Sequence, residues 1–218
     1  MSTMAEALAR LLDPAAKVSA HYLIDEDGTV YRLVDEARRA WHAGVSEWAG
    51  ERDINGISIG IELVNPGHAY PGYAGGYRPF PEPQMAALVK LARDILARHA
   101  IPPQRVLGHS DVAPARKTDP GELFDWERLA AAGIGLMPRR RVTRHKTLAP
   151  GDSGRLARGF QIRLRRFGYG IAVSGIYDLA TESVVKAFQR HYRRSQVDGI
   201  ADAETRAALD DLLDQTGL

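Results

Sequence analysis

The 218-residue sequence contains no cysteine. This absence excludes a disulfide framework and a thiolate metal site, so any zinc must be held by histidine and carboxylate side chains. The sequence also lacks any apolar run that approaches the roughly 20 residues needed to cross a membrane. The first residues, MSTMAEALARLLDP, have no basic start, no apolar stretch and no small-residue cleavage site. We therefore expect no signal peptide at this start.

Neither sign of charge dominates, because the formal net charge is only +2. With 44% hydrophobic and 26% charged residues, the composition is that of an ordinary globular protein. The basic residues are nevertheless clustered, at Arg139, Arg140, Arg141, Arg144, His145 and Lys146 and at Arg163, Arg165, Arg166, Arg190, Arg193 and Arg194. Such clusters can bind nucleic acid. A solvated linker and helix surface explains them as well, and we expect no nucleic-acid partner.

Hydrophobic periodicity and turn residues predict the elements of the first 137 residues. In chain order these are a helix over 2–12, strands over 21–25 and 29–34, a buried strand over 56–64, a long loop over 65–83, a helix over 82–100, a short strand over 105–108, a polar loop over 109–120 and a helix over 124–132. Asp27-Gly28 is a strong hairpin signal between the first two strands. Strands that alternate with helices indicate an α/β domain, with a mixed central sheet flanked by helices.

The last third of the chain contains a linker and helical patterns only, without the alternating strands of the first 137 residues. Residues 138–151 form a basic, proline-bounded linker, and three helical patterns follow over 153–167, 181–194 and 202–213. We therefore divide the chain into an α/β domain at 1–137, the linker at 138–151 and a small three-helix domain at 152–218. The linker composition predicts modest contact between the two folded parts. The expected core of the helical domain is Leu156, Ile162, Leu164, Val184, Phe188 and Leu209.

One loop combines three chemically useful side chains. His109, Lys117 and Asp119 lie within the segment HSDVAPARKTDP, which follows a predicted strand. An imidazole and a carboxylate are acceptable zinc ligands, and a loop can bring them together around a metal. A lysine beside such a ligand could stabilise an oxyanion. The alternative is a surface loop that carries a salt bridge.

Other polar residues stand where chemistry or packing could use them. Glu62 interrupts an apolar strand, where it is either an ion-paired strand residue or a general base that faces a cleft. Trp41 and His42 lie in a glycine-containing loop and suit a groove for a sugar-peptide, although a tryptophan that anchors the loop to the core is as common. For His21, a packed and hydrogen-bonded strand residue is favoured over a metal ligand.

Four sequence segments, taken in their order along the chain, are more informative about function than any single residue. VSAHYLIDEDGTVYRLV, AWHAG, INGISIGIEL and GHSDVAPARKTDPG together resemble the type-2 N-acetylmuramoyl-L-alanine amidases, relatives of phage amidase-lysozymes and animal peptidoglycan recognition proteins. The resemblance covers about residues 1–137. It implies a zinc ion held by two histidines and an aspartate or cysteine. The matching positions are His109 and Asp119 for zinc, Glu62 as catalytic carboxylate, Lys117 for the tetrahedral intermediate, and His42 and Asn55 for the substrate groove.

The sequence departs from this family at one ligand. The first zinc-binding histidine of the family lies in a strand just before the helix that opens this chain, and His21 matches a different family position. With His109 and Asp119 alone, a catalytic centre is one protein ligand short. We therefore expect the chain as printed to bind zinc weakly. Either the start is assigned too far downstream, or the chain is a natural variant that binds without cutting.

The C-terminal segments RRFGYG, SGIYDLATESVVKAFQRHY and VDGIADAETRAAL resemble the common bacterial peptidoglycan-binding module. The two resemblances together imply hydrolysis of the amide between N-acetylmuramic acid and L-alanine, in peptidoglycan or in muropeptides. The alternative is a non-catalytic peptidoglycan-binding protein, or a helical domain that only packs on its neighbour. A wall-binding module suits the periplasm or cell envelope of a bacterium, whereas the lack of a visible signal suits the cytoplasm.

Overall fold

A computed structural model describes residues 3–68, 77–139 and 145–218. The chain forms two compact units: the first comprises Met1–Ser46, Asp53–Ile101 and Leu123–Asp125, and the second comprises Glu47–Arg52, Pro102–Glu122 and Trp126–Leu218. The predicted loop over 65–83 and the linker over 138–151 lie partly outside the described residues. Within the described ranges, no helix is long and apolar enough to cross a membrane.

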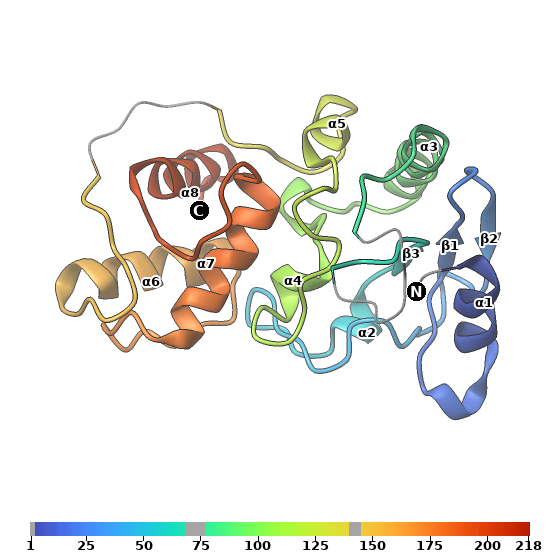
Figure 1. Cartoon of the computed structure of the whole chain (residues 1–218), viewed down its shortest axis with the longest axis horizontal. Helices are drawn as coiled ribbons and strands as arrows, with labels where there is room; N and C mark the ends of the chain where they lie inside the picture. Colours follow the sequence, from blue (N-terminus) through green and yellow to red (C-terminus); the bar gives the residue numbers. More distant parts are fainter. Residues whose placement is uncertain (1–2, 69–76, 140–144) are drawn as a thin grey trace. The chain divides into compact units, whose positions relative to one another are not determined.

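The first unit is built on a mixed sheet of three short strands (Figure 1). The strands are β1 (Tyr22–Ile24), β2 (Val30–Arg32) and β3 (Ile61–Leu63), in the order β2-β1-β3. β1 runs antiparallel to β2 and parallel to β3. The predicted hairpin is confirmed, and Gly28 is required in its turn: φ is +89°, and a Cβ atom there would lie 2.8 Å from the carbonyl oxygen of Pro83.

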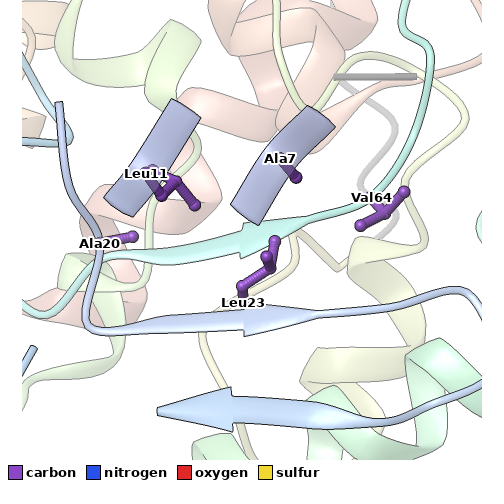
Figure 2. Close-up of a cluster of buried hydrophobic side chains, with 5 residues drawn as sticks. All are labelled: Ala7, Leu11, Ala20, Leu23 and Val64. Atoms are coloured by element: carbon purple, nitrogen blue, oxygen red, sulfur yellow. The ribbon is translucent and has the colours of Figure 1, made fainter. Parts of the chain in front are cut away.

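Helix α1 (Met4–Leu12) covers one face of this sheet. Thr3 caps it by accepting a hydrogen bond from the backbone N–H of Glu6 at 3.3 Å. Figure 2 shows how two side chains of the helix face the strands across a small apolar core. The members of this core are Ala7, Leu11, Ala20, Leu23 and Val64.

Helix α3 (Glu82–Arg98) contacts β1 as well and supplies buried Met85, Leu88 and Ile95. Pro83 stands in its first turn, where a missing N–H costs nothing. The amide of Gln84 is fully buried and donates to the carbonyl oxygens of Ile24 and Val64, both at 3.0 Å. This amide satisfies backbone acceptors at the ends of two parallel strands.

Two predicted strands are wrong in part or in whole. The strand over 56–64 begins late, because Ile54–Ile57 form a helical turn, α2, and only Ile61–Leu63 pair as β3. The strand over 105–108 is absent: Pro103–Arg105 form a 3-10 turn, and the predicted loop opens with helix α4 (His109–Val112). A proline at the first position of a turn favours helical dihedral angles, which an apolar pattern does not reveal.

The second unit contains the three predicted C-terminal helices, α6 (Arg155–Phe167), α7 (Leu179–Tyr192) and α8 (Ala203–Thr216). Among the described residues there are two further short helices, a 3-10 turn at Pro14–Ala16 in the first unit and α5 (Trp126–Ala131) in the second. Asp178 and Asp202 cap α7 and α8, and each accepts from the backbone N–H three residues later at 2.9 Å.

A buried glutamine fixes each of the two turns in this helical bundle. Gln161 of α6 donates to Ile176 O and Thr181 Oγ1 and accepts from Gly175 N. In the same way, Gln189 of α7 donates to the carbonyl of Ile200 and the hydroxyl of Thr205 and accepts from the N–H of Gly199. The bundle therefore repeats one helix-turn-helix device, with α7 shared between its two copies.

The core of the bundle is mostly as predicted. Leu164, Val184, Phe188 and Leu209 are buried. Leu156 and Ile162 are not, with 49% and 46% of their surface exposed, so their assignment to the core is wrong. The buried stripe of α6 instead contains Ala157, Phe160, Gln161, Leu164 and Phe167, at helical spacing that leaves both residues to one side.

The described ends of the linker are held against the bundle. Asp211 of α8 accepts from the backbone N–H of Arg139 at 2.7 Å, and Gln215 donates to the carbonyl of Met137 at 3.1 Å. At the other end, Leu148 forms a β-bridge with Ala201. The backbone near both ends of the linker therefore contacts the bundle, whereas the basic side chains of Arg139 and Lys146 are exposed.

Adjacent leucines of α1 allow a matched test of the first core. Leu11 is 8% exposed and lies in the cluster of Figure 2, whereas Leu12 is 64% exposed. We expect Leu11→Ala to lower the free energy of unfolding by about 2–5 kcal/mol, because it leaves a cavity. Leu12→Ala should change it by less than about 0.5 kcal/mol. Urea unfolding followed by circular dichroism measures both, and equal losses would contradict the packing described.

Glu36 ties the loop after β2 to the end of α3. Its carboxylate accepts from Tyr22 Oη at 2.5 Å, from Arg98 Nη2 at 2.6 Å and from His99 Nε2 at 2.7 Å. The hydrogen bond from Arg98 is the largest influence on the pKa of Glu36. Together with those from Tyr22 and His99, it outweighs burial and lowers this pKa from 4.5 to about 2.

A lowered carboxylate pKa stabilises the fold above the unfolded-state pKa and loses that effect in acid. We therefore expect Glu36→Gln to lower the urea midpoint at pH 7. The difference from the parent should shrink as the pH falls from about 4.5 towards 2, where the carboxylate becomes protonated in both states. Glu51→Gln, at an exposed glutamate, is the control and should change little. A Glu36→Gln effect that is constant with pH would contradict this account.

Candidate functional site

The loop that carries His109 and Asp119 closes on itself. Helix α4 begins at His109, and the backbone N–H of Ser110 donates to the carbonyl of Asp119 at 2.9 Å. This bond joins the two ends of the loop, and it leaves His109 Nδ1 3.0 Å from Asp119 Oδ2. The structure thus brings together the two residues that the sequence predicted as metal ligands.

The electrostatics of this pair favour an ionised carboxylate. Burial tends to raise the pKa of Asp119, but the hydrogen bond with His109 and the charges of His109 and Lys117 outweigh it. The pKa of Asp119 therefore lies below its usual value. An anionic oxygen beside an imidazole nitrogen is a donor pair that zinc accepts.

The residue two positions after His109 is fully buried. Asp111 Oδ2 accepts from the backbone N–H of Gly108 at 2.8 Å and from His191 Nδ1 at 2.8 Å, and Asp111 Oδ1 accepts from the hydroxyl of Tyr169 at 2.7 Å. Burial, followed by the charge of Asp111, raises the pKa of Tyr169 well above its usual value, so the phenol keeps its proton and donates. We call Gly108, Asp111, Tyr169 and His191 the Asp111 cluster. Sequence reasoning missed this cluster.

Aromatic rings enclose the histidine of the cluster. The His191 ring stacks on Trp126 with centroids 3.7 Å apart and on Tyr192 with centroids 3.9 Å apart. Tyr169 packs edge-on against Trp48, with ring centroids 4.9 Å apart. All of these residues belong to the second unit, so this unit includes the predicted metal loop together with the helical bundle.

In the first unit, His21 is a structural residue. It has no exposed surface; Nδ1 accepts from the backbone N–H of Gly60 at 2.9 Å, and Nε2 lies 3.0 Å from the carbonyl oxygen of Arg38. A ring whose two nitrogens are both engaged by backbone has no lone pair left for a metal. The packed alternative for His21 is confirmed.

The loop around His42 is positioned by two residues that lie close to it. Asn55 is 9% exposed, and its carbonyl oxygen accepts from the backbone N–H groups of His42 at 3.0 Å and Ala43 at 2.8 Å. Gly60 lies directly under the His42 ring, since a Cβ atom on Gly60 would come within 2.3 Å of it. Contact of His42 and Asn55 with substrate stays a prediction.

The other two predicted site residues of this unit are accessible. Trp41 is 55% exposed, with the guanidinium of Arg39 5.7 Å from its ring centroid, so it does not anchor the loop in the core. Glu62 is half-buried at the centre of β3, where it pairs in register with Leu23 of β1. Glu62 and His109 belong to different units, and their convergence on one cleft stays a prediction.

The described residues bring together two side chains whose donor atoms zinc accepts. His109 and Asp119 have suitable donor atoms at a suitable separation. No group of three histidine, aspartate or glutamate side chains that could hold a metal occurs in the part of the chain that the structure describes. The pair fits zinc chemically, but as an incomplete set.

Comparison with known proteins identifies the family. Residues 1–122 match the family described as N-acetylmuramoyl-L-alanine amidase, and residues 154–209 match a family of peptidoglycan binding domains. The first match covers more than half of the chain, which therefore belongs to the N-acetylmuramoyl-L-alanine amidase family.

Individual relatives agree with this assignment. The chain is 39% identical over 219 residues to the N-acetylmuramoyl-L-alanine amidase AmiD of Escherichia coli K12, covering 96% of this chain and 78% of that protein. It is 41% identical over 112 residues to the 1,6-anhydro-N-acetylmuramyl-L-alanine amidase AmpD of the same organism, covering 51% of this chain and 56% of AmpD.

Solved structures resemble the whole chain. The complex of AmiD from E. coli with anhydro-N-acetylmuramic acid-L-Ala-D-gamma-Glu-L-Lys matches with a TM-score of 0.82 and 37% identity, covering 99% of this chain and 86% of that one. AmpDh3 from Pseudomonas aeruginosa in complex with anhydromuramic pentapeptide matches with a TM-score of 0.77 and 31% identity, covering 98% and 88%.

The close approach of Gly60 to His42 predicts a measurable coupling. Gly60→Ala should cost about 1–3 kcal/mol of stability, because the added methyl group overlaps the imidazole. In a His42→Ala background the same change should cost much less. Gly159→Ala is the control, since a Cβ atom there meets nothing within 4 Å, and in α6 it should stabilise by about 0.5–1 kcal/mol. Equal costs of Gly60→Ala in both backgrounds would contradict the contact.

Proposed function

We propose that this chain hydrolyses the amide between the lactyl group of N-acetylmuramic acid and L-alanine in peptidoglycan fragments. The facing pair of His109 and Asp119 carries the proposal, because the sequence resemblance implies these two residues as zinc ligands and their Nδ1 and Oδ2 atoms lie 3.0 Å apart. The relatives whose structures were solved in complex with anhydromuramyl peptides support fragments of peptidoglycan as the substrate class.

We assign His109 and Asp119 to zinc; the site needs a third donor as well, since the described residues contain no group of three that could hold a metal. A zinc ion held there would supply a Lewis acid for the scissile carbonyl and would lower the pKa of the attacking water. The other roles belong to side chains of the chain itself. Glu62 accepts the proton of the attacking water, and Lys117 stabilises the negative charge that develops on the carbonyl oxygen.

Substrate recognition falls to the loop of Trp41 and His42 and to Asn55. Trp41 is 55% exposed and is assigned to stack on a sugar, and we assign the imidazole of His42 in the same loop to the substrate as well. Asn55 holds this loop by accepting two of its backbone N–H groups, so its contribution to binding includes the shape of the loop. The division into an amidase region at 1–137, a linker at 138–151 and a peptidoglycan-binding region at 152–218 belongs to this proposal.

The test measures zinc content and release of L-alanyl peptide from anhydromuropeptide, with zinc added in excess. We expect His109→Ala and Asp119→Ala to lose both zinc and turnover. Lys117→Ala should keep zinc and lose turnover by about 100-fold or more, because its role is confined to the transition state. Glu62→Gln should behave like Lys117→Ala.

Arg116→Ala, at an exposed cation next to Lys117, is the control and should keep both zinc and turnover. Binding of the muropeptide without release of peptide, at any zinc concentration, would contradict an enzyme and favour a non-catalytic peptidoglycan-binding protein. Turnover that survives His109→Ala would contradict the ligand assignment.

A further inference from the structure

We propose that Tyr169 and His191, two residues of the helical bundle, are positioning residues for His109 and act on it through Asp111. The inference rests on the proposed function, since it concerns the loop that we assign to zinc. It gives the bundle a second role besides attachment to peptidoglycan, because the bundle holds in place the loop over 109–119, which we call the metal loop.

The starting observation is a charge in an unusual place. Asp111 has no exposed surface, and a buried carboxylate is costly unless hydrogen-bond donors surround it. Of its three donors, only Gly108 N–H comes from the loop itself. The other two are the Tyr169 hydroxyl and His191 Nδ1, which lie 58 and 80 positions later in the chain.

These two donors are themselves rigidly held. His191 lies between the rings of Trp126 and Tyr192, and it is 2% exposed. Tyr169 is 1% exposed and packs against Trp48. A donor side chain that is held by packing on several sides restrains the position of its acceptor. A solvent-exposed donor would instead move with the acceptor.

Asp111 passes this constraint to His109 through the backbone. Asp111 is the third residue of α4, and its carboxylate accepts from Gly108, the residue that caps the helix immediately before His109. The backbone N–H groups of Ser110 and Ala113 complete the turn by donating to Asp119 O and His109 O, at 2.9 and 3.0 Å. The direction of the His109 side chain therefore depends on where the bundle holds Asp111.

The test uses two tyrosines of the same bundle. Tyr169→Phe removes the hydroxyl that reaches Asp111. Tyr177→Phe is the matched control, because Tyr177 is also 1% exposed and its hydroxyl donates to the carbonyl of Gly199 at 2.6 Å, away from the loop. Both variants lose one buried hydrogen bond, and both should be less stable than the parent. The loss should be larger for Tyr169→Phe, because its acceptor is a buried carboxylate and not a carbonyl group.

Only Tyr169→Phe should loosen the metal loop. We expect faster hydrogen exchange at the amides of Ser110 and Ala113, and an affinity for zinc, measured by chelator competition, that is about tenfold lower. Tyr177→Phe should leave both unchanged. Equal exchange at these amides in the two variants would overturn the inference. A parent chain that binds no zinc would refute the metal assignment made under the proposed function. Hydrogen exchange at the amides of Ser110 and Ala113 would still test whether Tyr169 positions the loop.

His191 provides a rescue experiment. His191→Ala removes the donor, whereas the side-chain amide of His191→Asn places an N–H near the former position of Nδ1. Both variants lose the stacking on Trp126, so both should be less stable than the parent. Slow exchange at Ser110 and Ala113 should return in His191→Asn and not in His191→Ala. Loss of protection to the same extent in both would show that packing alone, and not the bond to Asp111, holds the loop.

Discussion

A carboxylate without solvent needs donors, and the second unit is arranged around that requirement at Asp111. One donor comes from the start of α4 and two come from the helical bundle, so the loop and the bundle fold as a single compact unit. The glycines of the FGYG segment serve the same arrangement. A Cβ atom on Gly168 would lie 2.4 Å from the ring of Trp48, the residue against which Tyr169 packs. Small residues therefore allow the close approach that delivers the hydroxyl to Asp111.

Much of the fold followed from local signals. The hairpin at Asp27-Gly28, the opening helix and the three C-terminal helices were predicted because turn residues and helical spacing act over a few positions. The short elements around residues 54–57 and 103–112 were not, since a single helical turn has no periodicity to read. Leu156 and Ile162 were misassigned for another reason. In a bundle of this size each helix buries a narrow stripe, and a leucine or isoleucine beside that stripe remains exposed.

The candidate site divides in the same way. His109 and Asp119 were predicted from the wording of one loop, and one backbone bond across its ends brings them together. The Asp111 cluster joins residues 58 and 80 positions apart, which no local pattern reports. One signal was nevertheless present. His191 lies three residues after Phe188 and one before Tyr192, on the apolar face of α7, and a polar ring on such a face requires a buried partner.

The Asp111 cluster also bears on how such a chain can be recombined. The two family matches, at 1–122 and 154–209, divide the chain into two sequence modules, or cassettes, joined by a linker. Gene fusion would join two such modules end to end. The second compact unit draws residues from both cassettes. A chimaera that exchanges the helical cassette for another must therefore supply a hydroxyl and a ring N–H at the same two places. Without them, the loop keeps a buried carboxylate with a single donor, the backbone N–H of Gly108. The boundary between the two family matches in the sequence is therefore not a boundary between compact units of the protein.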